Sequence, residues 1–253
     1  MMDTKKSFKS VEKLNIVGWP ADRNFEPHGL SHWVHKNKSV SVFIVFHMPE
    51  AVGRFLYDGK SSLTLTKLYQ DYEHMRNINS VHLTGEDSFY LTNMLQARFR
   101  DRLSATIELL LFGFKTSNVL YVNDNKYMVA ADGLLLPNGV TGDDRFVYVN
   151  TNGAVKVFTK RSDNTLQYYK SIPITIGSLD NIKIDEFGDL WLGCQNVLEE
   201  AVEHSDYPDR HGCRSSVIRV KDPTGVAEVE SVFVDDTSLI QASSVAIYTN
   251  RSF

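Results

Sequence analysis

The sequence predicts an all-β protein of the β-propeller class, because one phrase recurs along the chain. Residues 178–194 show it most clearly: two short apolar strands alternate at period two around a turn in which Gly188 is free to take a positive φ. Related phrases begin near residues 27, 79, 138 and 241. The starts therefore lie roughly 40 to 60 residues apart, which is the spacing of propeller blades and predicts about five of them.

Each of these phrases carries a polar side chain close to the point where its first strand begins. The residues at these points are His28, Asn79, Asn138, Asp180 and Asn181. In a propeller the first strand of each blade lines the central channel, so these side chains are expected to meet at the axis. Taken singly, each is an ordinary turn residue. As a set at equivalent points, the carboxylate and the amide oxygens indicate ligands for a hard cation such as calcium.

The composition is that of a single folded domain. The chain has 253 residues, of which 42% are hydrophobic and 23% are charged, and its net charge is -4. We expect a disordered leader at residues 1–10 and one propeller domain over residues 11–253. The mild negative charge gives no reason to expect nucleic acid as a partner. Neither a signal peptide nor an apolar run of about 18 residues, long enough to span a membrane, is visible.

The remaining elements follow from alternation and turn residues. Strands or hairpins are expected at residues 11–18, 40–46, 54–57, 63–69, 77–91, 106–114, 119–123, 127–131, 139–160, 166–171, 216–220 and 229–234. Residues 94–103 place arginines among Leu95, Phe99 and Leu103, which favours a helix. Residues 195–213 are rich in charge and are expected to form a solvated loop.

The cysteines and the glycosylation motifs carry weaker signals. Cys194 and Cys213 are too few for a disulfide framework, and they either form one bridge or stay as free thiols. Asn37 and Asn250 begin N-glycosylation sequons. These would make the chain a glycoprotein only if it is secreted.

Together these phrases resemble the serum paraoxonase/arylesterase family over nearly the whole chain, from about residue 19 to residue 248. The segments that carry the resemblance, in the order in which the family has them, are Pro27-His28-Gly29-Leu30-Ser31, His47-Met48-Pro49, Asn77-Ile78-Asn79, Asn138-Gly139, Leu179-Asp180-Asn181-Ile182 and Gly188-Asp189-Leu190-Trp191-Leu192-Gly193-Cys194. The family fold is a six-bladed propeller. The chain is therefore expected to be a six-bladed β-propeller of the paraoxonase type that is incomplete, with about five blades.

The resemblance implies a calcium-dependent hydrolase of aryl esters and lactones, with one catalytic and one structural calcium ion in its channel. The residues that match ligands of the catalytic calcium are Asn79, Asn138, Asp180 and Asn181. The backbone carbonyl of Leu30 matches a ligand of the structural calcium. His28 matches a histidine that acts on the hydrolytic water, and His47 matches its partner in a histidine dyad. Calcium would polarise the ester carbonyl, and a neutral histidine would accept a proton.

The chain departs from the family pattern in three places. Residues 1–9 do not carry the acidic pair of the family's first blade, and the family's last strands have no counterpart before residue 253. Ser80 stands where the family has an aspartate that binds the structural calcium. We therefore expect a shortened chain in which Asp180 is the only carboxylate of the catalytic site and the structural site binds nothing.

The same departures support a function of another class. The alternative is a catalytically impaired relative that acts as an interaction protein and assists the assembly of membrane channels. The expected partner is a small-molecule ester or lactone in the first case, and a membrane or membrane protein in the second. By resemblance, the expected location is extracellular or associated with the endoplasmic reticulum or a membrane.

Overall fold

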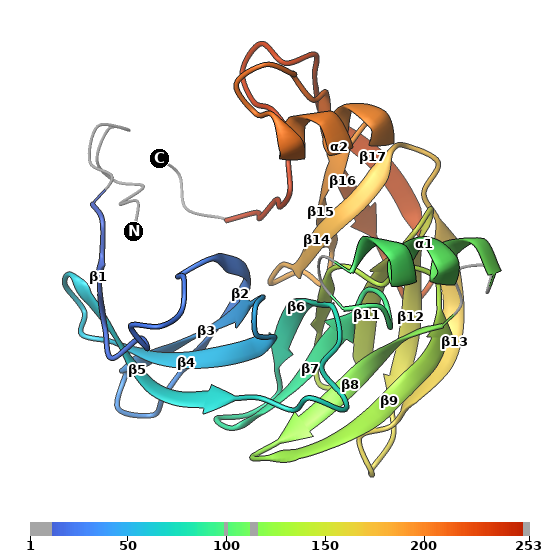
Figure 1. Ribbon diagram of the computed structural model, residues 1–253. Coiled ribbons are helices and arrows are strands. Elements are labelled where there is room, and N and C mark those ends of the chain that lie inside the picture. Colours follow the sequence, from blue (N-terminus) through green and yellow to red (C-terminus); the bar gives the residue numbers. More distant parts are fainter. Residues whose placement is uncertain (1–11, 99–100, 112–115, 250–253) are drawn as a thin grey trace.

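The computed structural model describes residues 12–98, 101–111 and 116–249, which form four β-sheets and two helices. Figure 1 shows the sheets arranged in an arc around a common centre. We number these sheets blade 1 to blade 4 in chain order. The strands of blade 1 are β1 (Asn15–Val17), β2 (Pro27–Val34), β3 (Val40–Phe46), β4 (Ala51–Tyr57) and β5 (Ser62–Tyr69).

Blades 2, 3 and 4 each have four strands in sequence order. The strands of blade 2 are β6 (Ile78–Leu83), β7 (Ser88–Asn93), β8 (Ser117–Asn123) and β9 (Lys126–Leu134). Those of blade 3 are β10 (Val140–Gly142), β11 (Phe146–Thr151), β12 (Ala154–Lys160) and β13 (Leu166–Pro173). Those of blade 4 are β14 (Ser178–Ile184), β15 (Leu190–Gln195), β16 (Ser215–Lys221) and β17 (Glu228–Asp235).

The first strands of consecutive blades lie beside one another. β2 contacts β6, β6 contacts β10 and β10 contacts β14, so these four strands form the inner side of the arc (Figure 1). Within each blade the chain runs outward through antiparallel neighbours, and β1 joins the outer edge of blade 1 by parallel pairing with β5. The predicted all-β propeller architecture is therefore confirmed.

The expected number of blades is wrong, because the described residues form four rather than about five. The copy that was expected to begin at residue 241 contains no regular strand in the described range 241–249. It lies against blade 4 instead: the Asn181 amide donates to the Ser244 carbonyl at 2.9 Å, and the ring of Tyr248 stacks on Trp191 at 5.4 Å. An apolar pattern predicts extended backbone, but it does not supply the partner strand that a sheet needs.

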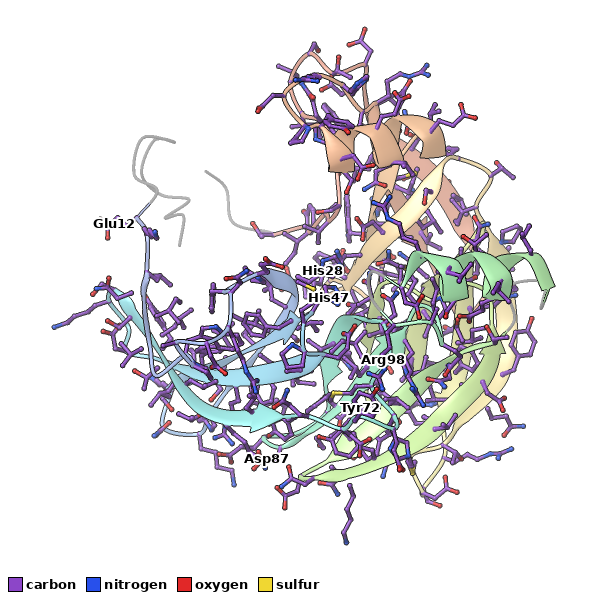
Figure 2. All side chains as sticks on the ribbon, viewed as in Figure 1. Glu12, His28, His47, Tyr72, Asp87 and Arg98 are labelled. Atoms are coloured by element: carbon purple, nitrogen blue, oxygen red, sulfur yellow. The ribbon has the colours of Figure 1, made fainter. Side chains whose placement is uncertain are left out.

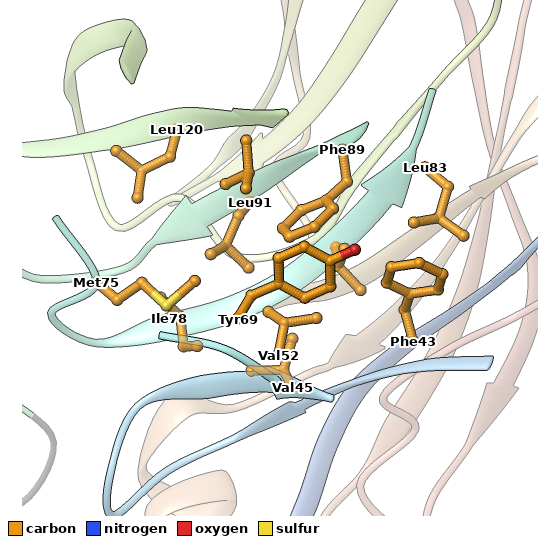
Figure 3. Close-up of a cluster of buried hydrophobic side chains, with 12 residues drawn as sticks. Phe43, Val45, Val52, Tyr69, Met75, Ile78, Leu83, Phe89, Leu91 and Leu120 are labelled. Carbon is orange, nitrogen blue, oxygen red and sulfur yellow. The ribbon is translucent and has the colours of Figure 1, made fainter. Parts of the chain in front are cut away.

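Each interface between consecutive blades has its own hydrophobic core. Figure 3 shows the core between blades 1 and 2, where Phe43 and Tyr69 of blade 1 meet Phe89 of blade 2. The three rings are fully buried, and the Tyr69 and Phe89 rings pack edge to face at 5.2 Å. Similar clusters fill the next two interfaces. Burial of this kind fixes the blades relative to one another and therefore fixes the inner strands.

Both helices differ from the expectations. The helix that was expected at residues 94–103 is α1 (Arg102–Leu111), so the strand expected at 106–114 is wrong as far as residue 111; residues 112–115 lie outside the described range. Asp101 starts α1, because its carboxylate accepts the Ser104 amide at 3.1 Å. The loop expected at 195–213 contains α2 (Leu198–Asp206), whose first turn carries two glutamates that suit a helix N-terminus.

Smaller expectations concern the two cysteines, membrane spans and the ends of the chain. Cys194 and Cys213 are both buried free thiols. Within the described residues no helix is long and apolar enough to cross a membrane. The leader expected at residues 1–10 and the sequon at Asn250 lie outside the described residues.

Candidate active site at the inner strands

Three of the four inner strands carry a β-bulge at the same point, and the bulges hold most of the predicted site residues. The bulged pairs are His28 and Gly29 in β2, Asn79 and Ser80 in β6, and Asp180 and Asn181 in β14. Asn138 and Gly139 lie at the equivalent point before β10, where they exchange backbone hydrogen bonds with Asn150 at 2.9 Å. A bulge redirects side chains away from the regular pleat. The repeat of the sequence phrase is therefore a repeat of this local geometry.

The backbones of consecutive blades touch at these points. The Gly139 amide donates to the Asp180 carbonyl at 3.2 Å, and the Thr92 hydroxyl donates to the Asn138 carbonyl at 2.6 Å. A Cβ atom built on Gly29 would lie 2.3 Å from the Asn79 carbonyl oxygen, so no side chain fits there. These contacts bring the predicted residues of blades 1 to 4 into one continuous row along the inner strands.

His28, His47 and Asn79 lie together, as Figure 2 shows for the two histidines. Their imidazole rings have centroids 5.0 Å apart and planes 62° apart. The Asn79 side-chain amide donates to His28 Nε2 at 3.1 Å. Since Nε2 accepts this bond, the proton of the neutral His28 ring lies on Nδ1. The sequence placed these three residues on different segments, and the fold brings them into contact.

The environment keeps His28 neutral at pH 7. The ring keeps contact with solvent, but the protein around it removes much of its hydration, and this burial lowers the pKa of His28 to about 4, with a smaller contribution from His47. The neutral ring retains a lone pair on Nε2, which the Asn79 amide occupies. A proton can therefore be taken up at this atom only if that hydrogen bond opens.

Glu50 is a site residue that the sequence analysis missed. Its Oε2 atom lies 3.1 Å from His47 Nδ1 and also accepts the Ile78 amide at 3.3 Å. The side chains of His47 and Glu50 are only 8% and 7% exposed. A carboxylate at this place fixes the orientation of the imidazole ring. The spacing of three residues across Pro49 is the signal that was available in the sequence.

Asp180 lies in a half-buried position and is held by side-chain amides. The Gln195 amide donates to Oδ2 at 3.2 Å, and the Asn181 amide donates to Oδ1 at 3.3 Å. Burial raises the pKa of Asp180 to about 6, and its contact with Asn138 offsets a part of this increase. The described residues thus give this carboxylate amide partners but no cationic side chain in an ion pair.

Two of the predicted ligand atoms are buried acceptors without a partner. Among the described residues, Oδ1 of Asn79 and Oδ1 of Asn138 have no hydrogen bond, and the same holds for Oδ1 of Asn150. Buried polar atoms normally find partners, and amide and carboxylate oxygens are the donors that calcium prefers. With Asp180 they make an oxygen set that fits a hard dication. No group of three or more His, Cys, Asp or Glu within the described ranges makes a metal site of another kind.

Leu30 has a different environment from the other predicted ligands. Its backbone carbonyl accepts a hydrogen bond from the Lys183 ammonium at 3.2 Å, and its own side chain is 56% exposed. The structure therefore places Leu30 on an inner strand, as expected, but brings a cationic side chain to the atom that was predicted to bind metal.

A pocket of about 400 Å³ opens beside the His47–Glu50 pair. Its lining residues are Met48, Pro49, Glu50, Gln70, Asp71, Tyr72, Met75 and Arg98. The Arg98 guanidinium lies 3.4 Å from the centre of the Tyr72 ring and donates to the Tyr72 carbonyl at 2.6 Å. Figure 2 shows these two residues near the histidine pair. The pocket is mixed in character, with apolar walls and three charged side chains, Glu50, Asp71 and Arg98.

The arc of blades and the polar starts of its inner strands define a β-propeller with a site on the strands that face its centre. A family model described as Arylesterase matches residues 1–253, and the chain belongs to this family. Similar proteins include serum paraoxonase/arylesterase 1 of Rattus norvegicus, which is 30% identical over 97% of this chain and 70% of its own length. Serum paraoxonase/arylesterase 2 of Gallus gallus is 28% identical, with the same coverage.

More distant similarities were found as well. Serum paraoxonase/lactonase 3 of Mus musculus is 25% identical over 99% of this chain and 72% of its own length. Among solved structures, a luciferin-regenerating enzyme matches with a TM-score of 0.49 at 13% identity, over 83% of this chain and 64% of that one.

Proposed function

We propose that the chain hydrolyses esters or lactones at the inner-strand site, with a calcium ion as cofactor. The observation that carries the proposal is the set of buried, unpaired amide oxygens of Asn79 and Asn138 beside the Asp180 carboxylate, next to the His28–His47 pair. The names of the relatives, arylesterase and lactonase, support the reaction class.

The residues that would hold the ion are Asn79, Asn138, Asp180 and Asn181, which we call the ligand ring. Asp180 supplies the one formal negative charge of this set, and the asparagines supply neutral oxygens. When bound, calcium supplies a positive charge that polarises the ester carbonyl and stabilises the negative oxygen of the transition state. The Asn79 amide has a second role, because its donor end holds His28 while its acceptor end is free for the ion.

The protons are handled by the two histidines. His28 is neutral at pH 7 and is positioned to accept a proton from water at Nε2 once the bond from Asn79 opens. His47 lies against it, and Glu50 Oε2 contacts His47 Nδ1 and fixes the orientation of its ring. In this proposal the proton is taken up at His28.

The pocket beside Glu50 supports a substrate with an apolar body. Met48, Tyr72 and Met75 offer apolar and aromatic surface, which suits an aryl group or the aliphatic chain of a lactone. Arg98 is the group that would attract the carboxylate product of ester cleavage.

The test is the hydrolysis of phenyl acetate and of an aliphatic lactone by the purified chain, in calcium and in chelator. We expect turnover in calcium and its loss in chelator, and we expect Asp180→Ala to be inactive in both. The matched control is Asp132→Ala, which removes an exposed aspartate from β9. Full activity of Asp180→Ala contradicts the proposed site. A folded wild-type chain without any turnover contradicts the enzyme and favours the interaction protein.

A further inference from the structure

A lysine reaches across the centre of the arc from blade 4 to blade 1. Lys183 lies on β14, and its ammonium donates to the carbonyl of Leu30 on β2 at 3.2 Å. The two residues are 153 positions apart in the sequence. The bond therefore joins the first and the last blade of the described structure directly.

The polar groups beside Gly29 and Leu30 on β2 and β6 do not fit a divalent ion. Ser80, the residue that stands where the family has an aspartate, is only 3% exposed and carries no charge. Its hydroxyl oxygen accepts the Val140 amide at 3.4 Å, and its own amide donates to the Thr92 hydroxyl at 3.0 Å. The Leu30 carbonyl is bound to the ammonium. A dication needs six or more oxygens and some negative charge, and here one carbonyl and one neutral hydroxyl are already in use.

Burial lowers the pKa of Lys183 below its usual range. His82, two residues after Ser80 on β6, has its pKa lowered to about 4 by burial and then by Lys160 and Lys183. His82 is therefore neutral and adds no second charge. We call Leu30, Ser80, His82 and Lys183 the lysine level.

We propose that the Lys183 ammonium is a built-in cation that replaces the second calcium ion expected from the family, so that the chain binds one divalent ion and not two. The geometric part of this inference stands on the Lys183–Leu30 contact; only the number of ions depends on the function proposed above. The ammonium repels a dication at the same place and meets the same carbonyl, so it both excludes the metal and takes over its contact between blades.

The first experiment counts the ions. Calcium bound to the metal-stripped chain is measured by equilibrium dialysis with radioactive calcium, and we expect one ion per chain. Two ions in the wild type overturn the inference and leave the proposed function standing. No ion at all overturns the proposed calcium site, and the Lys183 variants then decide the inference alone.

The second experiment measures thermal unfolding in chelator. Lys183→Met removes the ammonium and keeps the length of the side chain, so we expect its Tm to fall by about 3 to 8 °C. Lys183→Arg keeps the charge and should recover most of that loss. The matched control is Lys170→Met, because Lys170 also donates to a distant carbonyl, that of Gly225 at 2.5 Å, but from β13 at the outer edge of blade 3. We expect a loss of about 2 °C or less there. Equal losses for the two methionine variants overturn the inference.

The third experiment restores the acidic residue. In the double variant Ser80→Asp, Lys183→Met the neutral hydroxyl becomes a carboxylate and the ammonium is gone. We expect the number of bound calcium ions to rise by one relative to the wild type. A double variant that folds, as judged by circular dichroism, and binds no additional ion contradicts the view that Lys183 keeps the metal out.

Discussion

The ligand ring and the lysine level occupy neighbouring positions on the same inner strands, yet their polar groups are satisfied in opposite ways. In the ligand ring, the Oδ1 atoms of Asn79 and Asn138 are buried without a partner, and Asp180 has no cation beside it in the described structure. In the lysine level, the amide and the hydroxyl of Ser80 and the carbonyl of Leu30 each have a hydrogen-bond partner from this chain. On β6 the two levels are one residue apart, at Asn79 and Ser80. The ligand ring contains buried oxygens without a hydrogen-bond partner, whereas Ser80 and Leu30 of the lysine level have partners.

The difference teaches which level requires a ligand. An unpaired buried oxygen costs about 1–3 kcal/mol, so a ring with several of them is stable only if something else contributes. A complete level needs no additional group, and adding a dication to it would place two positive charges together. The comparison therefore predicts that calcium stabilises the ligand ring and does not bind at the lysine level. It also predicts that, without calcium, loss of the Asp180 charge does not destabilise the chain, whereas loss of the Lys183 charge does.

The largest effect is expected from removing the charge of the ligand ring while keeping its shape. Asp180→Asn should reduce ester hydrolysis by about 10³-fold or more, because the ion loses its only carboxylate. In chelator the same variant should be at least as stable as the wild type, since a buried carboxylate without a cation is removed. Hydrolysis rates and urea unfolding check the two halves. An Asp180→Asn variant that keeps its activity and is less stable than the wild type in chelator would contradict both expectations.

Calcium itself should have the next largest effect. At 10 to 100 times its Kd, calcium should stabilise the chain by about 1.4–2.7 kcal/mol, which corresponds to a rise in Tm of about 4 to 10 °C for a chain of this size. Lys183→Met should keep this rise and Asp180→Asn should lose it. Differential scanning calorimetry with and without calcium gives the result. A calcium-dependent rise in Tm that requires Lys183 but not Asp180 would mean that the metal binds at the lysine level and not in the ligand ring.

A smaller effect should follow from Glu50→Gln. Glu50 positions His47 through the contact between Oε2 and Nδ1, so we expect kcat to fall by about 10- to 100-fold while KM and the calcium response change little. The matched control is Glu86→Gln, because Glu86 also contacts a histidine, His35 at 3.5 Å, on the exposed side. Steady-state kinetics decide between the two positions. The same loss in both variants would show a general effect on stability instead.

The smallest effect concerns residues 235–244, which lead from the end of β17 to the contact between Ser244 and Asn181 of the ligand ring. Bonds from the Ile240 amide, the Ser238 hydroxyl and further amides lower the pKa of Asp235 to about 2. A carboxyl group with a lowered pKa contributes stability that is fully present above its ordinary pKa, near 4, and is lost as the pH falls through about 2. Asp235→Asn should therefore lower the urea midpoint at pH 7, and its difference from the wild type should shrink between pH 4 and pH 2. A constant difference over that interval would contradict this assignment.

The sequence predicted those parts of the molecule that repeat. Alternation and spacing placed most of the strands, and the recurring phrase placed Asn79 and Asp180 at equivalent points, because each copy folds by the same local rules. In the structure these points are β-bulges, which the sequence analysis did not predict. α1 was displaced in the prediction because its start depends on Asp101 and on Glu108, whose carboxylate accepts the Ala97 amide at 2.7 Å. Such contacts depend on the course of the backbone and leave no periodic signal.

Glu50 and Lys183 were missed for a related reason. Glu50 lies outside the repeated phrase and Lys183 lies within it, at residues 178–194, but each becomes meaningful only through a partner that the topology supplies. Glu50 needs the turn after β3 to face His47, and Lys183 needs blade 1 to lie opposite blade 4. Periodicity reports which face of a strand is inside, but it carries no information on which distant strand it meets.

Gly29 has a consequence for the tolerance of the site to change. The blades approach at this point until the backbone of β6 occupies the space that a methyl group on Gly29 would need, 2.3 Å from the Asn79 carbonyl oxygen. The short distance between His28 and Asn79 therefore depends on the lack of a Cβ atom at position 29. Any side chain at position 29 would press on the Asn79 backbone as a wedge between blades 1 and 2 and would separate the side chains of His28 and Asn79. Gly29 takes no part in the proposed reaction, but it keeps His28 and Asn79 at the right distance. Substitutions at position 29 should therefore be as restricted as substitutions of the proposed metal ligands.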